Sequence, residues 1–477
     1  MALLNNRMFQ VMLVILLAAC IGVLSTTNMG AAVCLIMFCG IITLLVISKL
    51  KNIQKIVLAY LFITILFPKA GVKLGGLPLT VSNIFLCMSL FFCVIYYFAQ
   101  RNRKISHLHT DSFVRKYLIG SLLYFLSLTV LSVMEYDVQR TLIAFIPNIL
   151  PIFSLFFIYF FVPEKGNILR KIMIYASFFL VIYGTIQLIF GHYETVIPGL
   201  TVNYSDYAEG NVFESKNNVT ALGLKLVSTY QNGNLYGSAL IFISIFMFGC
   251  MLNTMKKRKK LLYFIMVTLS VINLVATLSR SALIGFVVGI LVMGFLVRPV
   301  RKYIFLFTGI ALIYIFASGY SERIFAHDAT GAGRMPQYEN LMHSIANMGF
   351  GEQVRFFLIG KGFGLSSEFH NGYFLTQVES SLMNFILYSG LIGLLVYSIP
   401  LFYTFLRLVK WKKNKEKKDK NFIVAASLYA ALIGMLGQAA IDQLLNLPPT
   451  GQNFWIILSI LLIFLRSREE ELIEKKA

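Results

Sequence analysis

The sequence predicts an all-α fold, a polytopic bundle of membrane-spanning helices. Of its 477 residues, 58% are hydrophobic and only 13% are charged, whereas a typical soluble domain carries about 25% charged residues. The apolar residues also fall in runs of roughly 20, the length that crosses the hydrocarbon core of a bilayer as a helix. A soluble chain of this composition could not cover its apolar surface with polar side chains.

Apolar runs mark about 14 candidate spans. The run near 56–68 is short for a span, and Pro147 and Pro151 predict a kink in the run at 142–162, because proline removes a helical hydrogen bond. The predicted spans are 8–27, 29–48, 56–68, 81–99, 117–134, 142–162, 172–190, 235–252, 261–278, 281–297, 303–319, 381–406, 421–441 and 452–466.

The net charge of +21 first suggests a nucleic-acid-binding protein. The basic residues, however, fall in short clusters between apolar runs, as at 256–260 and 410–420. If the N-terminus is cytoplasmic and the spans alternate, every large basic cluster falls on the cytoplasmic side, as the positive-inside rule requires. The sequence therefore predicts a multi-pass membrane protein with both termini in the cytoplasm.

This topology divides the chain into alternating membrane and external regions. The segment 320–379 is longer than a simple connection needs to be. Within it Tyr338, Leu341, Met342 and Ile345 have helical spacing, so we expect a short helix there, lying on the membrane surface. The predicted regions are N-terminal helices at 1–190, an external loop at 191–233, helices at 234–319, a large external loop at 320–379, C-terminal helices at 380–466 and a cytoplasmic tail at 467–477.

Ionisable residues are almost absent from the spans away from their ends, although transporters and pumps usually keep them at membrane depth. Arg280 stands out by its position, because it lies in the short hinge TLSRS with hardly any loop between two apolar runs. An arginine at such a hinge either extends its side chain to the headgroups or binds a phosphate group through two parallel hydrogen bonds. Both interpretations remain open on this observation alone.

Four stretches together resemble one known family, the O-antigen ligase/polymerase superfamily of bacterial envelope glycosyltransferases. Lys225 stands where that family usually has arginine, and Gly233 where it has proline. The most diagnostic stretch is the one that contains Arg280. The stretches are KLVSTYQNGNLYG at 225–237, TLSRSALIG at 277–285, Gly333-Arg334 with IGKGFG at 359–364, and ESSLMNFILYSGLIG at 379–393.

The resemblance implies a substrate and a site. Members of the family transfer a glycan from a polyprenyl diphosphate to a sugar hydroxyl outside the cytoplasmic membrane, with neither a metal nor a cofactor. Implied partners are the lipid-linked glycan, membrane lipid, and flippase and chain-length regulator proteins, with no nucleic acid. Cations must offset the charge on the diphosphate leaving group, so Arg280 and Lys225 are the first candidates. Further candidates for binding the diphosphate or glycan are Asn234, Arg334, Arg355 and Lys361.

A base near the acceptor hydroxyl is also needed. Ligases of the family carry a His-Asn pair about eleven residues before the first glycine of the Gly-Leu-Ile-Gly turn, here Gly390, but that position holds Glu379-Ser380. The pair His370-Asn371 occurs too early. Glu379 therefore favours a polymerase over a ligase, with His370 as the other candidate base. In a purely structural interpretation, Glu379 is a carboxylate at a helix N-terminus and His370 an ordinary loop residue.

A lipid-linked glycan flippase has a similar number of spans and is the alternative from a different class. A flippase is expected to line a central cavity with charged residues from several spans, whereas this chain keeps its charges on the external segments. A purely structural membrane protein would leave Arg280 and the 320–379 segment unexplained.

Overall fold

Nearly all regular structure in the computed structural model of the chain is helical, as the apolar runs predict. The structure describes residues 52–66, 71–74, 77–80, 82–87, 90, 112–161, 167–191, 195, 219–220, 223–230, 232–304, 309, 334–363, 367–370, 373–376, 378–413 and 420–474. The predicted spans at 8–27 and 29–48 lie outside these residues, and those at 81–99 and 303–319 lie mostly outside them.

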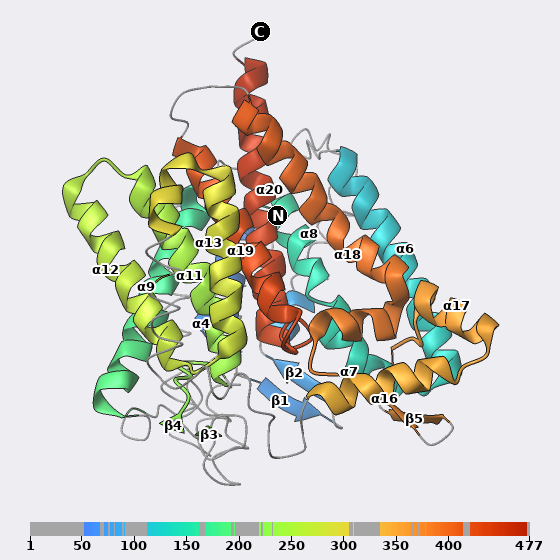
Figure 1. Ribbon diagram of the computed structural model, residues 1–477. Helices are drawn as coiled ribbons and strands as arrows, with labels where there is room; N and C mark the ends of the chain where they lie inside the picture. Colours follow the sequence, from blue (N-terminus) through green and yellow to red (C-terminus); the bar gives the residue numbers. More distant parts are fainter. Residues whose placement is uncertain are drawn as a thin grey trace, which may run out of the picture.

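The helices run side by side in a bundle, with three short hairpins at one end (Figure 1). The helices are α4 (Asn52–Leu66), α6 (Ser112–Glu135), α7 (Val138–Ile149), α8 (Ile152–Phe161), α9 (Asn167–Phe190), α11 (Gly233–Asn253), α12 (Lys257–Ala276), α13 (Arg280–Leu296), the short 3-10 helix η2 (Arg298–Val300), α16 (Arg334–Ala346), α17 (Phe350–Ile359), α18 (Ser381–Lys413), α19 (Lys420–Ala439) and α20 (Pro448–Glu474). The strands are β1 (Gly71–Leu74), β2 (Leu77–Thr80), β3 (Val219–Thr220), β4 (Gly223–Leu224), β5 (Ser367–His370) and β6 (Tyr373–Thr376).

Seven of the described helices are long and apolar enough to cross a membrane, or eight if the bent pair of α7 and α8 is one span. The predicted number of about 14 is not confirmed by the part of the chain that is described. Helices α4 and α13 match predicted spans but contain only 15 and 17 residues. At 1.5 Å per residue such helices are shorter than the roughly 30 Å core of a bilayer.

The predicted kink is confirmed. Helices α7 and α8 meet at an angle of 49°, with Pro147 inside α7 and Pro151 in the break. Proline at these positions withholds a backbone donor and obstructs the preceding turn, so the apolar run bends instead of continuing straight.

The centre of the bundle is α11, in which nearly every residue is buried. It packs against α12, α13 and α19, and α13 packs in turn along α19. Where α13 and α19 cross, a Cβ atom built on Gly434 would lie 2.7 Å from the backbone oxygen of Gly285. Small residues let helix backbones approach this closely, which gives the dispersion contacts that hold helices together in lipid.

Three antiparallel hairpins, β1–β2, β3–β4 and β5–β6, were not part of the predicted all-α fold. They lie in segments between the predicted spans, or at their ends, where the sequence pattern gave no helical periodicity. The short helix predicted around 338–345 is confirmed as α16, which buries Leu341 and Ile345 but leaves Met342 exposed. The large loop predicted at 320–379 therefore contains two short helices, α16 and α17, and the β5–β6 hairpin.

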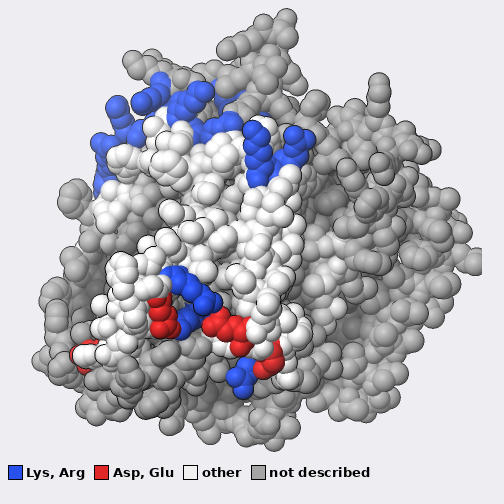
Figure 2. All heavy atoms as spheres, turned by 90° about the vertical axis from the view of Figure 1, so that its right-hand side faces the viewer, with Lys and Arg blue, Asp and Glu red and all other residues white. Residues whose placement is uncertain are grey.

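Charge divides the described part of the bundle into two ends. The starts of α6 and α12 and the ends of α18 and α20 lie at the top of Figure 1, which we call the basic end, and the turn between α12 and α13 lies at the opposite, site end. Figure 2 shows lysines and arginines gathered at the basic end, a band without charge below them, and mixed positive and negative charges near the site end. This distribution agrees with the clustering on which the predicted topology depends.

Candidate functional site

Arg280 lies in a tight turn between two helices, residues 277–281, which we call the Arg280 turn. Leu278 has a φ of 52°, a left-handed conformation that costs a residue with a side chain about 1 kcal/mol or more. Ser279 caps α13 by accepting a hydrogen bond from the amide of Ala282 at 3.3 Å. Arg280 is therefore the first residue of α13, and its side chain is exposed.

The segment before α11 packs against this turn. The amide of Leu226 donates to the carbonyl of Ala276 at 3.1 Å, at the end of α12. A Cβ atom built on Gly233 would lie 2.7 Å from the carbonyl oxygen of Thr277, so no larger residue fits without movement. The first and second of the four family-like stretches, which begin at residues 225 and 277, are thus neighbours in space.

The end of α19 connects these two stretches. Gln438 donates through its side-chain amide to the backbone oxygen of Asn234 at 2.9 Å, and Asn234 accepts a hydrogen bond from the amine of Lys225 at 3.4 Å. One turn further along the chain, the carboxylate of Asp442 accepts a hydrogen bond from the hydroxyl of Ser281. Gln438, in the last turn of α19, therefore contacts the first stretch, and Asp442, three residues beyond the end of α19, contacts the second.

Asp442 also contacts the start of α18. Its backbone oxygen accepts hydrogen bonds from the amide and the hydroxyl of Ser381, at 3.2 and 3.1 Å. Glu379 lies two residues earlier, is exposed, and donates its backbone amide to the side chain of Gln337 in α16 at 3.1 Å. The structure therefore brings the chain segments of Lys225, Asn234, Arg280 and Glu379 to one place at the site end of the bundle.

Two further predicted cations, Arg355 and Lys361, have carboxylate partners. Arg355 forms an ion pair of 2.9 Å with Glu135 of α6, and Lys361 one of 2.7 Å with Glu352 of α17.

Two predicted residues are described only through their backbones. Arg334 begins α16, and its side chain lies outside the described part of the structure. His370 ends β5 and pairs with Tyr373 of β6 in the hairpin register. The position of its imidazole likewise lies outside the description, so the choice between Glu379 and His370 stays a prediction.

The glycine-rich stretch at 360–363, which we call the Lys361 loop, packs against a break in α18. Gly390 interrupts α18 with φ 63° and ψ −171°, and Gly360 has φ 73° and ψ −167°. Only glycine readily adopts this conformation. The amides of Lys361 and Gly362 donate to the carbonyls of Leu387 and Tyr388 at 2.8 and 3.0 Å, so the loop satisfies carbonyls that the break leaves without helical partners. These amides are occupied and do not form a phosphate cradle.

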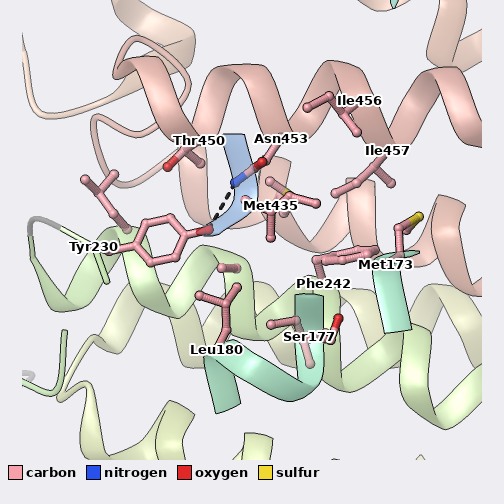
Figure 3. A pocket seen from close by; sticks show the side chains of 14 residues that line it. Met173, Ser177, Leu180, Tyr230, Phe242, Met435, Thr450, Asn453, Ile456 and Ile457 are labelled. Atoms are coloured by element: carbon pink, nitrogen blue, oxygen red, sulfur yellow. Dashed lines mark hydrogen bonds between the residues drawn. The ribbon is translucent and has the colours of Figure 1, made fainter. Parts of the chain in front are cut away.

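A small cavity lies beside the first family-like stretch, between α9, α11 and α20 (Figure 3). Its lining is mostly apolar, and its volume of about 20 Å³ is enough for a single water molecule. Asn453 donates to the phenol oxygen of Tyr230 at 3.1 Å at its polar end. Burial raises the pKa of the Tyr230 phenol, so this hydroxyl stays neutral. The cavity is too small for a sugar or a lipid chain.

Asp442 and Gln438 are the residues of this site that sequence reasoning missed. The available signal was two polar residues four apart, at the end of an otherwise apolar run in QAAIDQ. That spacing does not show which other segments lie beside the helix. No group of three or more histidine, cysteine, aspartate or glutamate residues suited to a metal ion occurs in the described ranges.

Comparison with known proteins leaves the functional assignment to the site itself. No family model matches the chain, and no curated protein matches it significantly.

Proposed function

We propose that this protein is a bacterial membrane glycosyltransferase, a polymerase that joins polyprenyl-diphosphate-linked oligosaccharide repeat units into an O-antigen, capsular polysaccharide or exopolysaccharide. The reaction takes place at the outer face of the cytoplasmic membrane, and both chain termini are cytoplasmic. The single observation that carries the proposal is the meeting of the Arg280 turn with the segments of Lys225 and Glu379 at the end of the bundle opposite the basic end.

The charge distribution supports the orientation. Lysine and arginine clusters remain on the cytoplasmic side of membrane proteins, so the basic end faces the cytoplasm and the site end faces outward. A lipid-linked glycan presented at the outer leaflet has its diphosphate at the headgroup level, which is the level of the Arg280 turn.

The chemistry supports the choice of substrate. An exposed arginine at the first position of a helix is unfavourable for the helix, because the positive end of the helix dipole repels a cation. The same helix end and the same arginine both attract an anion. A diphosphate bound there offsets the repulsion, and its developing negative charge is stabilised as the glycosidic bond breaks.

Glu379 supplies the second half of the reaction. Its carboxylate accepts the proton of the acceptor hydroxyl while that oxygen attacks the anomeric carbon and the lipid diphosphate leaves. This assignment favours a polymerase over a ligase, the nearest alternative, because the ligase-like His370 lies out of register. The alternative of another class, a flippase, would move the same lipid without forming a covalent product.

The test is incubation of the purified protein with a polyprenyl-diphosphate oligosaccharide. We expect a ladder of products from the native chain and no ladder from Arg280→Ala. The matched control is Arg298→Ala, because Arg298 lies at the opposite end of α13 and is also exposed. A single discrete transfer product would indicate a ligase, transbilayer movement without a product would indicate a flippase, and an active Arg280→Ala variant would remove the proposed mechanism.

A further inference from the structure

Asp442 is the only carboxylate among the buried residues that the structure describes, with an exposed fraction of 4%. Removing a carboxylate from water costs several kcal/mol unless hydrogen bonds or counter-charges compensate it. It lies in the short connection between α19 and α20, where a neutral residue would close the turn at no such cost. The buried carboxyl group of Asp442 therefore needs a structural or functional reason.

The contacts of Asp442 reach two segments that are far apart in sequence. Its side chain accepts the hydrogen bond of Ser281, the residue after Arg280. Its backbone oxygen accepts two hydrogen bonds from Ser381, two residues after Glu379. Ser381 in turn accepts hydrogen bonds from the amides of Leu444 and Leu445 at 2.6 and 2.9 Å. The α19–α20 connection is thus hydrogen-bonded through its backbone to Ser381 at the start of α18, and through the Asp442 carboxylate to Ser281 at the start of α13.

We infer that Asp442 is a positioning residue of the proposed site, which fixes the Arg280 turn relative to the segment that carries Glu379. This inference rests on the proposed function. Asp442 touches no substrate in this role and acts through Ser281. A carboxylate suits the task because it accepts shorter and stronger hydrogen bonds than a neutral group and is favourable near a helix N-terminus.

The role explains why a strained turn can carry a functional arginine. Leu278 keeps its left-handed conformation only if the surroundings hold it. A turn that relaxed by about 1 Å would misplace the guanidinium, and a displacement of that size can cost roughly 10²-fold in rate. The hydrogen bond from Ser281 to Asp442 fixes the residue directly after Arg280, so its loss changes rate more than abundance.

The test is a double-mutant cycle in the polymerisation assay. Asp442→Ala and Ser281→Ala should each lower kcat about 30-fold or more with a donor KM changed less than threefold, and the double variant should be no slower than either single variant. Asp442→Asn should recover only part of the rate, because its amide oxygen still accepts from Ser281 but forms a weaker hydrogen bond than a carboxylate. Losses that multiply in the double variant, or a native rate in Asp442→Ala, would overturn the inference.

The control is Asp137→Ala. Asp137 is also a carboxylate near the site end that accepts a helix-capping hydrogen bond, from the amide of Arg140 at 2.7 Å, but it is exposed and is not part of the site. We expect native kcat from it. Abundance and elution in detergent are measured for every variant, and a rate loss in Asp442→Ala matched by an equal loss of folded protein would count against positioning.

A second measurement does not depend on any enzymatic activity. In a chain whose six native cysteines are replaced, a cysteine at position 280 is labelled by a charged, membrane-impermeant thiol reagent. Adding Asp442→Ala should change the labelling rate by at least threefold, whereas adding Asp137→Ala should not. An unchanged rate would show that Asp442 does not hold the turn. A chain that makes no ladder but shows this change would defeat the proposed function and keep the structural role of Asp442.

Discussion

The Arg280 turn and the Lys361 loop both contain a predicted cation beside residues with positive φ. The surroundings of the two cations differ. The Lys361 side chain is 11% exposed and pairs with Glu352, and the amides of Lys361 and Gly362 donate to α18. Arg280 keeps an exposed side chain, and its turn is connected through Ser281 to a buried carboxylate. A glycine-rich loop with a lysine is therefore no evidence for phosphate binding until the partners of its amides are known.

The largest expected effect is a loss of folded protein when the contact between the Lys361 loop and the break in α18 is disrupted. Gly390→Ala should lower the amount of folded protein in the membrane severely, because a Cβ atom there would overlap the backbone of Leu358 and its conformation is open only to glycine. Quantitative immunoblotting of membranes measures the effect. The control is Gly349→Ala, where no atom lies within 4 Å of an added Cβ. Normal abundance of Gly390→Ala would mean that the break in α18 is not required.

The next effect concerns the type of cation in the Arg280 turn. Arg280→Lys should lower kcat by about 10²-fold or more at normal abundance, because lysine lacks the planar group that makes two parallel hydrogen bonds to phosphate. The same exchange at Arg355, whose partner is Glu135, should leave the rate within about threefold. Rates of ladder formation at matched protein levels decide the point. A fully active Arg280→Lys variant would reduce the role of Arg280 to simple charge.

The choice of base follows. Glu379→Gln should lower the rate of polymerisation about 10²-fold, the usual scale for loss of a general acid or base, and His370→Ala should have a smaller effect. Rates are compared at equal concentrations of folded protein. If His370→Ala is inactive and Glu379→Gln is active, the ligase-like histidine takes over the role and the sequence register used here is wrong.

A smaller effect is expected for Lys361, where a substitution should lower stability without lowering kcat. Lys361→Met should cost about 1 kcal/mol of stability, since it leaves Glu352 without its ion-pair partner, and should leave kcat within about threefold. Adding Glu352→Gln should recover part of the stability. Thermal unfolding in detergent and the ladder assay provide the two measurements. A large loss of kcat at native stability would return Lys361 to the diphosphate site.

The smallest effect on stability and rate is expected for the exposed Arg355–Glu135 ion pair. The side chains of the Arg355–Glu135 pair are 55% and 35% exposed, and exposed ion pairs contribute little in water because solvent and salt screen them. Arg355→Ala should therefore change stability by less than about 1 kcal/mol and leave the rate of polymerisation within about threefold. A strong loss of activity would place Arg355 among the residues that bind substrate, as its position in the sequence first suggested.

Sequence reasoning succeeded where a short segment determines its own structure. The length of apolar runs predicts most of the described helices, and Pro147 and Pro151 predict the bend between α7 and α8. It failed where two distant segments must meet. Gly390 was recognised as the first glycine of the Gly-Leu-Ile-Gly turn, but the close approach of the Leu358 backbone could not be predicted from it. Asp442 looks like a polar residue near a helix end until its contacts with Ser281 and Ser381 are known.

The candidate site shows the same division. Arg280 was chosen from its hinge between two apolar runs and Glu379 from its spacing to Gly390 in the family resemblance, and the roles of both stay predictions. Arg355 was chosen as an external cation and Lys361 as the cation of the family-like stretch IGKGFG, and the carboxylates that pair with them come from α6 and α17. Pairing of this kind depends on how helices pack, which one sequence without its relatives does not reveal.

The burial of α11 has a consequence for how the chain is made. Ribosomes deliver α11 to the membrane before α12 and α13 and long before α19, three of the helices that pack against it. During this interval its flanks face lipid instead of protein. With a mean hydropathy of 2.1, α11 is apolar enough to be stable in lipid as a single span until its neighbours are inserted. The central helix of the finished protein thus enters the membrane after α4 and α6 to α9, and its packing is completed only when Lys420–Ala439 emerges near the end of synthesis.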